Sequence, residues 1–347
     1  MFFRNKILLS TFRFLLFPFA LIYESVVVVR RKAFQKGWLR PATFHTPTIC
    51  VGNLCMGGAG KTPHVEYIAK LLSQNFQVAI LSRGYGRKTK GYINASKMSS
   101  PTSDWVGDEI VQYIEKFPNV KVAVCESRKE GIKNLLMEEP ELQVIILDDA
   151  YQHLSVNYSL KIVLTEYDEP YFADFPIPAG RLREPRNAAK YADIIIVTKC
   201  PEILSLKERD DFIKSLKPQS HQEVFFTKIK YIEIGEGSKE ERKKREILLI
   251  TGIAHPEPLV KFLETQYDTI HKLHFPDHHV FTNSDIERII RLKDKLGGEN
   301  CTVLTTEKDA ARLAMMNNMP EYHTIPIEIV FLEKEDFFKK KLLSLLK

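Results

Sequence analysis

The sequence predicts an α/β protein with a mostly parallel sheet, a second, smaller α/β domain after it and a basic apolar segment before it. From residue 46 to about 230, short apolar runs alternate with helical segments, as in a parallel sheet whose strands are joined by helices. A charged stretch at 235–246 interrupts this alternation, which resumes at 247. The 347 residues are enough for two domains with sizeable cores.

The composition excludes several classes of protein. Hydrophobic residues make up 44% and charged residues 27% of the chain, as in soluble globular proteins. The five cysteines include no C-x-x-C pair, so neither a disulfide framework nor a zinc site is expected. Residues 1–40 contain eight Lys or Arg residues and one Glu, more than the whole net charge of +6. This local basicity argues against a nucleic-acid partner.

Residues 1–40 are expected to lie on a membrane surface. The segment is apolar and aromatic, but its longest charge-free run, Phe14 to Tyr23, is ten residues, whereas a spanning helix needs about 20. Pro18 is expected to interrupt any helix there, and no cleavage site typical of a secretory signal follows. Basic residues would contact anionic headgroups while apolar ones enter the interface. The alternative is a helix packed on the protein's own core.

The elements of the first domain, residues 41–230, follow one another in alternation. Its predicted strands are 48–51, 78–82, 120–125, 143–147, 160–164 and 193–198, and its helices lie near 62–74, 105–117, 128–138 and 203–216. The smaller domain, 231–347, has predicted strands at 247–250, 269–273 and 302–305, helices near 256–266, 283–296 and 308–316, and a last helical segment at 334–347.

The stretch GNLCMGGAGKTP at 52–63 predicts a phosphate-binding loop, because it lies between a strand and a helix. Its glycines allow backbone N–H groups to face a phosphate, and the helix start adds partial positive charge. Lys61 would reach the β- and γ-phosphates, and the Thr62 hydroxyl would bind Mg²⁺. The standard pattern has glycine where this chain has Cys55, and a variant class of ATPases has lysine in place of Met56. The predicted nucleotide-binding residues are Cys55, Met56, Gly57, Gly58, Ala59, Gly60, Lys61 and Thr62.

Further polar clusters follow predicted strands or begin helices. In SRGYGR at 82–87, Arg83 ends a strand and would face the ligand crevice of an open α/β sheet. The apolar run at 145–147 ends in Asp148 and Asp149, the form expected of a Walker-B magnesium site. A helix begins with Gly107-Asp108-Glu109. Three histidines at 274–279 indicate a functional site, with metal binding and a catalytic or orienting role as the two alternatives. A GTPase would have an aspartate after the lysine of TKCP at 198–201, and its absence favours ATP.

Together, the motifs GNLCMGGAGKTP, SRGYGR, GDE, LDDAYQH, PAGRLREP, FPDHH and TTEKDA resemble one family, the tetraacyldisaccharide 4′-kinases of lipid A synthesis. They run from residue 48 to about 310 in that family's order. The family's phosphate loop also lacks the first glycine, so Cys55 is not a departure from its pattern.

This resemblance implies a P-loop NTPase-type domain with a smaller domain closing over the nucleotide. The implied reaction transfers the γ-phosphoryl group of MgATP to the 4′-hydroxyl of a tetraacylated glucosamine disaccharide 1-phosphate. Asp108 would be the base, oriented by His278, with His274 and His279 left as alternatives, while Lys61 and Arg83 would stabilise charge. The implied location is peripheral, on the cytoplasmic face of the inner membrane, with no obligate protein partner. The rival hypothesis is a membrane-associated P-loop ATPase that acts as a switch or positioning factor.

Overall fold

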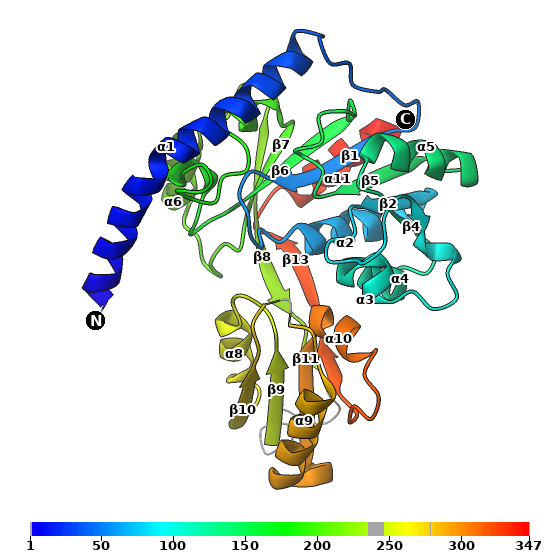
Figure 1. The fold of residues 1–347 in the computed structure, drawn as a ribbon, viewed down its shortest axis with the longest axis vertical. Coiled ribbons are helices and arrows are strands. Elements are labelled where there is room, and N and C mark those ends of the chain that lie inside the picture. Colours follow the sequence, from blue (N-terminus) through cyan, green and yellow to red (C-terminus); the bar gives the residue numbers. More distant parts are fainter. Residues whose placement is uncertain (1, 235–245, 278, 347) are drawn as a thin grey trace.

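The chain folds into a large domain around a nine-stranded sheet, a smaller domain around a four-stranded sheet, and a long N-terminal helix. This computed structural model describes residues 2–234, 246–277 and 279–346, with the side chains of residues 2–12 and 14 left out. Figure 1 shows the small domain projecting from one side of the large one, joined to it by two neighbouring strands.

The large sheet has the strand order β13-β8-β7-β6-β1-β5-β2-β4-β3. All its neighbouring pairs are parallel except β13–β8 and β3–β4. Because β1 lies between β5 and β6, the loop after β1 opens at the middle of the sheet's carboxyl edge. The strands are β1 (Thr48–Asn53), β2 (Val78–Ser82), β3 (Ile93–Asn94), β4 (Lys121–Val124), β5 (Val144–Asp148), β6 (Leu160–Glu166), β7 (Ile194–Thr198), β8 (Glu223–Tyr231) and β13 (Ile327–Phe331).

Helices cover both faces of this sheet, which is why its central strands are buried from end to end. One apolar cluster joins the sheet to Ile68, Ile110 and Phe338 of three helices, and a second joins the other face to Ile132 and Leu135. The helices are α2 (Lys61–Leu72), α3 (Ser103–Val106), α4 (Asp108–Lys116), α5 (Arg128–Glu138), α6 (Leu206–Leu216) and α11 (Glu335–Leu343), with 3₁₀ turns η1 (Ala95–Lys97), η2 (Tyr171–Ala173), η3 (Arg186–Tyr191) and η5 (Ser344–Leu346).

The small domain is a parallel sheet of order β10-β9-β11-β12, also covered on two faces. Alternate residues of its central strand pack against different helices, Leu249 with Leu259 on one face and Leu248 with Ile286 on the other. Its elements are β9 (Glu246–Thr251), α8 (Glu257–Leu263), β10 (Thr269–His274), α9 (Asn283–Lys295), η4 (Gly298–Asn300), β11 (Cys301–Thr306), α10 (Glu307–Leu313) and β12 (His323–Ile325).

The end of the chain returns to the large domain, so the prediction that 231–347 forms one smaller domain is wrong for its last part. β13 pairs with β8 in antiparallel register, with Ile327 opposite Tyr231. Phe338 and Leu342 of α11 are buried in the large core. The small domain is therefore an insertion between two adjacent strands of the large sheet.

The N-terminal helix α1 (Phe2–Gln35) runs without a break through Pro18, so the expected interruption is wrong. A proline within a helix removes one backbone donor, and this 34-residue helix continues past that single loss. Its second half is fastened to the large domain: Arg31 pairs with buried Glu184 at 2.8 Å, and the Tyr23 hydroxyl donates to the Arg183 carbonyl.

The same helix exposes a series of apolar side chains to solvent. Exposed large apolar residues on α1 include Leu15, Phe17, Phe19, Leu21, Ile22, Val26 and Val29. Within the described residues, no helix combines the length and the apolar character needed to cross a membrane.

Candidate active site

The predicted phosphate loop joins β1 to α2, which begins at Lys61. Gly60, directly before the helix, has a φ of 78°, a left-handed conformation that glycine adopts without steric cost. The Thr198 hydroxyl donates to the Ala59 carbonyl at 3.1 Å and fixes the loop from β7. The loop therefore presents the start of a helix at the centre of the sheet's carboxyl edge, where anions are favoured.

His64 braces this loop from inside the protein. Its Nδ1 lies 2.7 Å from the Gly60 carbonyl and its Nε2 lies 3.1 Å from the Thr227 hydroxyl. Because a carbonyl only accepts, Nδ1 is the donor. Burial lowers the pKa of His64 to about 4, so the ring is neutral at pH 7 and adds no charge beneath the phosphates.

The position of the missing first glycine has a structural explanation. Cys55 forms an antiparallel bridge with Leu182, and the Met56 N–H donates to the Arg181 carbonyl at 2.6 Å. The residues of the loop with positive φ are Gly57 and Gly60, and Cys55 is not among them. A side chain is therefore tolerated at 55, where the loop is held as an extended strand against the PAGRLREP segment.

Two cations and two acceptors gather beside the loop. Lys61 Nζ lies 3.4 Å from Asn53 Oδ1 and 3.9 Å from Asp149 Oδ1. Arg183 donates to both oxygens of Asp149, at 2.7 and 3.2 Å, and to Asn53 Oδ1 at 2.7 Å. Burial alone would raise the pKa of Asp149, but the charges of Lys61 and Arg183 outweigh it and hold the pKa below its usual value. An incoming phosphate would meet both cations here.

Asp148 is the more suitable of the two predicted magnesium ligands. It is buried at the end of β5, its Oδ2 accepts from the Ser82 hydroxyl at 3.2 Å, and its Oδ1 has no hydrogen-bond partner among the described residues. Burial, reinforced by Glu109 and Asp149, raises the pKa of Asp148 to about 8. Burial makes the negative charge of this carboxylate unfavourable, and its Oδ1 has no partner within the described part of the chain to offset it. A bound cation would stabilise that charge.

The acidic side chains alone do not complete a metal site. Across 2–234, 246–277 and 279–346, no three His, Cys, Asp or Glu side chains are grouped so as to hold an ion. A magnesium ion at Asp148 would therefore also need the Thr62 hydroxyl and phosphate oxygens. That is the usual arrangement, because Mg²⁺ is commonly held by one or two carboxylates together with substrate phosphates.

The first turn of α4, which carries Asp108 and Glu109, contacts the first turn of α2 at the end of the phosphate loop. Thr62 Oγ1 donates to Glu109 Oε1 at 3.2 Å, which ties α2 to α4. Gly107 precedes the helix with a φ of 96°, and a Cβ there would lie 2.8 Å from the Tyr85 carbonyl. The SRGYGR loop and this turn can therefore pack backbone to backbone, which sets the position of Asp108.

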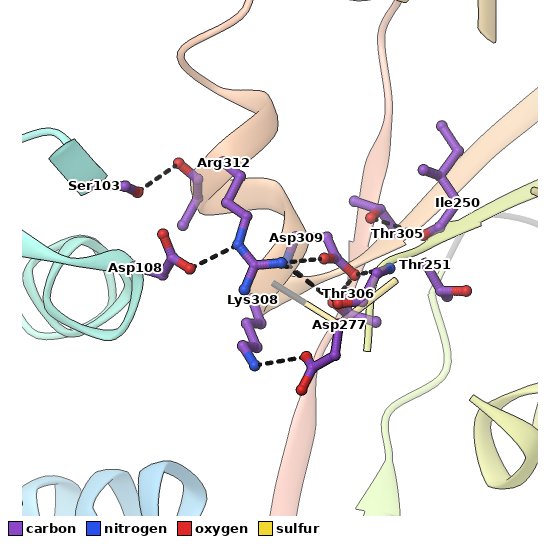
Figure 2. Close-up of polar contacts among 12 residues, drawn as sticks. Ser103, Asp108, Ile250, Thr251, Asp277, Thr305, Thr306, Lys308, Asp309 and Arg312 are labelled. Carbon is purple, nitrogen blue, oxygen red and sulfur yellow. Dashed lines mark hydrogen bonds and ion pairs between the residues drawn. The ribbon is translucent and has the colours of Figure 1, made fainter. Parts of the chain in front are cut away.

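The other residues predicted to act in catalysis are Asp108, Arg83 and His278. Figure 2 shows Asp108 facing Arg312 of α10, whose Nε donates to its Oδ2 at 2.6 Å. Arg83 is exposed after β2. Burial first, and then the charges of Arg128 and Arg83, lower the pKa of His153 to about 4. The proposed partner of Asp108, His278, lies outside the described residues.

Sequence reasoning missed four side chains of this site. Glu109 was noted only as part of a helix start and had no assigned role, although it contacts Thr62. Asn53 and Arg183 were inside quoted motifs but had no assigned role. Arg312 lies two residues beyond TTEKDA. Its spacing of three from Asp309 on a helix was the available signal, since such residues are neighbours on one face.

A family model described as tetraacyldisaccharide-1-P 4′-kinase (LpxK) matches residues 12–347. The chain belongs to this 4′-kinase family. The tetraacyldisaccharide 4′-kinase of Flavobacterium johnsoniae is 41% identical over 344 residues, 98% of each chain. The enzyme of that name from Bacteroides thetaiotaomicron is 40% identical, covering 95% of this chain and 92% of its own.

The fold agrees with the 4′-kinase family. A crystal structure of LpxK from Aquifex aeolicus in complex with ATP aligns with a TM-score of 0.75 and 27% identity, over 97% of this chain and all of that one. The family inferred from the motifs and the mostly parallel α/β fold with a P-loop are confirmed. The rival switch ATPase is not favoured.

Proposed function

We propose that the protein transfers the γ-phosphoryl group of ATP to the 4′-hydroxyl of a tetraacylated glucosamine disaccharide 1-phosphate, a step of lipid A synthesis. The observation that carries this proposal is a phosphate loop tied through Thr62 and Glu109 to the helix turn that presents Asp108, in a chain of the 4′-kinase family. A carboxylate next to a nucleotide site is what phosphoryl transfer to a hydroxyl requires.

The residues divide into those that hold the nucleotide and those that hold the metal. Residues 55–62 form the loop that binds the phosphates of ATP, through backbone N–H groups at the start of α2, since the Met56 N–H is already bonded to the Arg181 carbonyl. Lys61 and Arg183 balance the charge of the phosphates. Thr62 and Asp148 would hold Mg²⁺, with Asp149 as the alternative carboxylate. When bound, Mg²⁺ supplies neutralisation of the charge that develops between the β- and γ-phosphates.

Asp108 acts as the general base for the acceptor hydroxyl. It accepts the proton as the sugar oxygen attacks the γ-phosphorus, while the bond from that phosphorus to the β-phosphate oxygen breaks and ADP leaves. A positioned base contributes roughly 10²–10⁴-fold. His278 orients it, and Arg83 stabilises charge from the end of β2. Closure of the small domain over the nucleotide would bring residues 274–279 to the reacting groups and exclude water.

A transfer assay tests the proposal. The purified protein is incubated with γ-³²P-ATP, Mg²⁺ and the disaccharide 1-phosphate in detergent micelles, and the lipids are separated to look for a labelled product. We expect a glycolipid labelled at a phosphate monoester, and no product when EDTA removes Mg²⁺. ATP hydrolysis without labelled lipid, stimulated instead by a protein, would contradict the proposal and favour the switch ATPase.

We also propose that α1 attaches the protein to the cytoplasmic face of the inner membrane without crossing it. The support is the exposed apolar series on α1, next to the exposed basic residues Arg30, Lys32 and Lys36. Apolar burial and contacts with anionic headgroups add to each other in interfacial helices. Because the proposed substrate is a lipid, attachment to the membrane would bring the enzyme to its substrate.

Deletion of residues 1–30 tests this attachment. We expect the shortened protein to move from the membrane to the soluble fraction and to lose much more activity on substrate in a bilayer than in detergent. For the intact protein, salt should weaken but not abolish binding, because screening acts on the charges alone. Complete release by salt, or resistance to both salt and alkaline carbonate, would each contradict an interfacial helix.

A further inference from the structure

The small domain contacts the large one at the carboxyl edge of its own sheet, where Gly252 and Arg312 both hydrogen-bond to Asp309 and Arg312 also hydrogen-bonds to Asp108. β9 lies between β10 and β11, and α8 and α9 cover opposite faces. The chain therefore leaves the ends of adjacent strands in opposite directions, which is where ligands and functional groups gather in open α/β sheets. Gly252, Phe275 and Thr306 follow or end these three strands.

At this edge, α10 builds a rigid support for one arginine. Thr306 caps the helix, and its hydroxyl donates to Asp309 Oδ2 at 2.7 Å. The Gly252 N–H donates to the same oxygen at 2.9 Å. Asp309, which is fully buried, accepts from Arg312 Nη1 through its other oxygen at 3.1 Å. A charged pair with its remaining acceptors satisfied has little freedom to move.

This fixed guanidinium reaches across the domain boundary to the proposed base. Figure 2 shows Arg312 between Asp309 on its own helix and Asp108 on α4. The distance from Arg312 Nε to Asp108 Oδ2 is 2.6 Å. The Arg312 side chain is 5% exposed and that of Asp108 is 20% exposed. Asp108 is thus held by a partner that is itself immobilised, at the open side of the site.

We propose that Arg312 is a positioning residue for phosphoryl transfer, fixing the Asp108 carboxylate from the small domain. This inference rests on the proposed role of Asp108 as base. The helix that carries Arg312 also carries Lys308, whose ammonium lies 3.2 Å from Asp277 Oδ1, directly before His278 in the sequence. One short helix therefore contacts both the base and the loop with its proposed partner.

A second ion pair between the domains makes it possible to distinguish a positioning role of Arg312 from a role in holding the two domains together. At the other end of the same helix contact, Lys116 of α4 lies 2.8 Å from Glu307 of α10 and 2.8 Å from Glu66 of α2. It joins the two domains without contacting Asp108. Substitution of Glu307 therefore removes one interdomain pair and leaves Lys116 paired with Glu66, which makes it a matched control.

The experiment measures kcat and KM for Arg312→Gln, Arg312→Lys and Glu307→Gln, in the wild-type and the Asp108→Asn backgrounds. We expect Arg312→Gln to lower kcat by roughly 10–100-fold, since small misplacements of reacting groups cost up to about 10²-fold, with KM for ATP nearly unchanged. Arg312→Lys keeps one cationic contact and should recover part of the loss. Glu307→Gln should leave kcat nearly unchanged, because Lys116 keeps its pair with Glu66 and the contact of Arg312 with Asp108 remains in place.

The Asp108→Asn background decides how Arg312 acts. If it acts through Asp108, Arg312→Gln should add almost no further loss there, because residues that act as a unit are non-additive. Equal losses for Arg312→Gln and Glu307→Gln, or a fully additive double variant, would overturn the inference. Should Arg312→Gln fail to fold in a melting experiment, Arg312→Lys replaces it in the same additivity test. Normal kcat for Asp108→Asn alone would instead refute the proposed base.

Discussion

Replacing Lys61 with alanine is expected to abolish phosphoryl transfer, with kcat falling at least roughly 10²–10³-fold, as when one preorganised donor is removed from a transition state. Lys61 is the first residue of α2, and its ammonium points to Asn53 and Asp149 at the edge of the sheet. These contacts, at 3.4 and 3.9 Å, are long, so the melting temperature should change little. Turnover is measured with labelled ATP.

Lys70 provides the matched control for this substitution. It lies on the same helix, is 67% exposed and pairs with Glu328 at 3.1 Å, far along α2 from the loop. Lys70→Ala should leave kcat and KM unchanged.

Thr62→Ala should behave like Lys61→Ala, because it removes the hydroxyl assigned to Mg²⁺. Near-normal turnover in either loop variant would show that the nucleotide binds elsewhere.

The second large effect is expected at the proposed acid–base pair. Asp108→Asn should lower kcat by roughly 10²–10⁴-fold, the contribution of a positioned base, while asparagine can still accept the hydrogen bond from Arg312. If His278 orients the same carboxylate, His278→Ala should also lower kcat. The double variant should then be hardly worse than the more damaged single variant.

Three measurements complete this test. Fully additive losses in kcat would assign Asp108 and His278 to separate steps and contradict the pair. Asp104→Asn is the control on the neighbouring helix α3, because Asp104 is exposed and pairs only with solvent-facing Lys88 among the ion pairs of the described residues. Its kcat should match the wild type. A melting experiment on each variant confirms that the fold is retained.

The order of strands and helices around the nucleotide loop could be predicted because it depends on local patterns. The apolar run of β5 ends in two carboxylates, and the glycine-rich stretch lies between an apolar run and a helical one. Both features depend on neighbouring residues, and parallel strands bring their carboxyl ends to one edge. Lys61, Asp148 and Asp149 could therefore be placed near each other without coordinates.

What could not be predicted depends on contacts between distant segments. β8 and β13 are separated in sequence by the whole small domain, and no local periodicity indicates that they pair. Arg312 and Asp108 are in contact although 204 positions separate them in the sequence, so only the spacing of Arg312 from Asp309 was visible. Pro18 was misjudged for a different reason, since one lost hydrogen bond does not end a helix as long as α1.

The insertion of the small domain between β8 and β13 has a consequence for how the protein can be taken apart. Tyr231 and Ile327 face each other in the sheet, and the Ile232 N–H donates to the Pro326 carbonyl at 2.9 Å. The two strands that connect the domains are therefore adjacent where they leave the large sheet. A short turn joining Tyr231 to Ile327 could replace the whole small domain. A stop codon after β8 would instead remove Phe338 from the large core. Because two adjacent strands connect the domains, the small domain could change its angle to the large domain but could not rotate freely about a single connection.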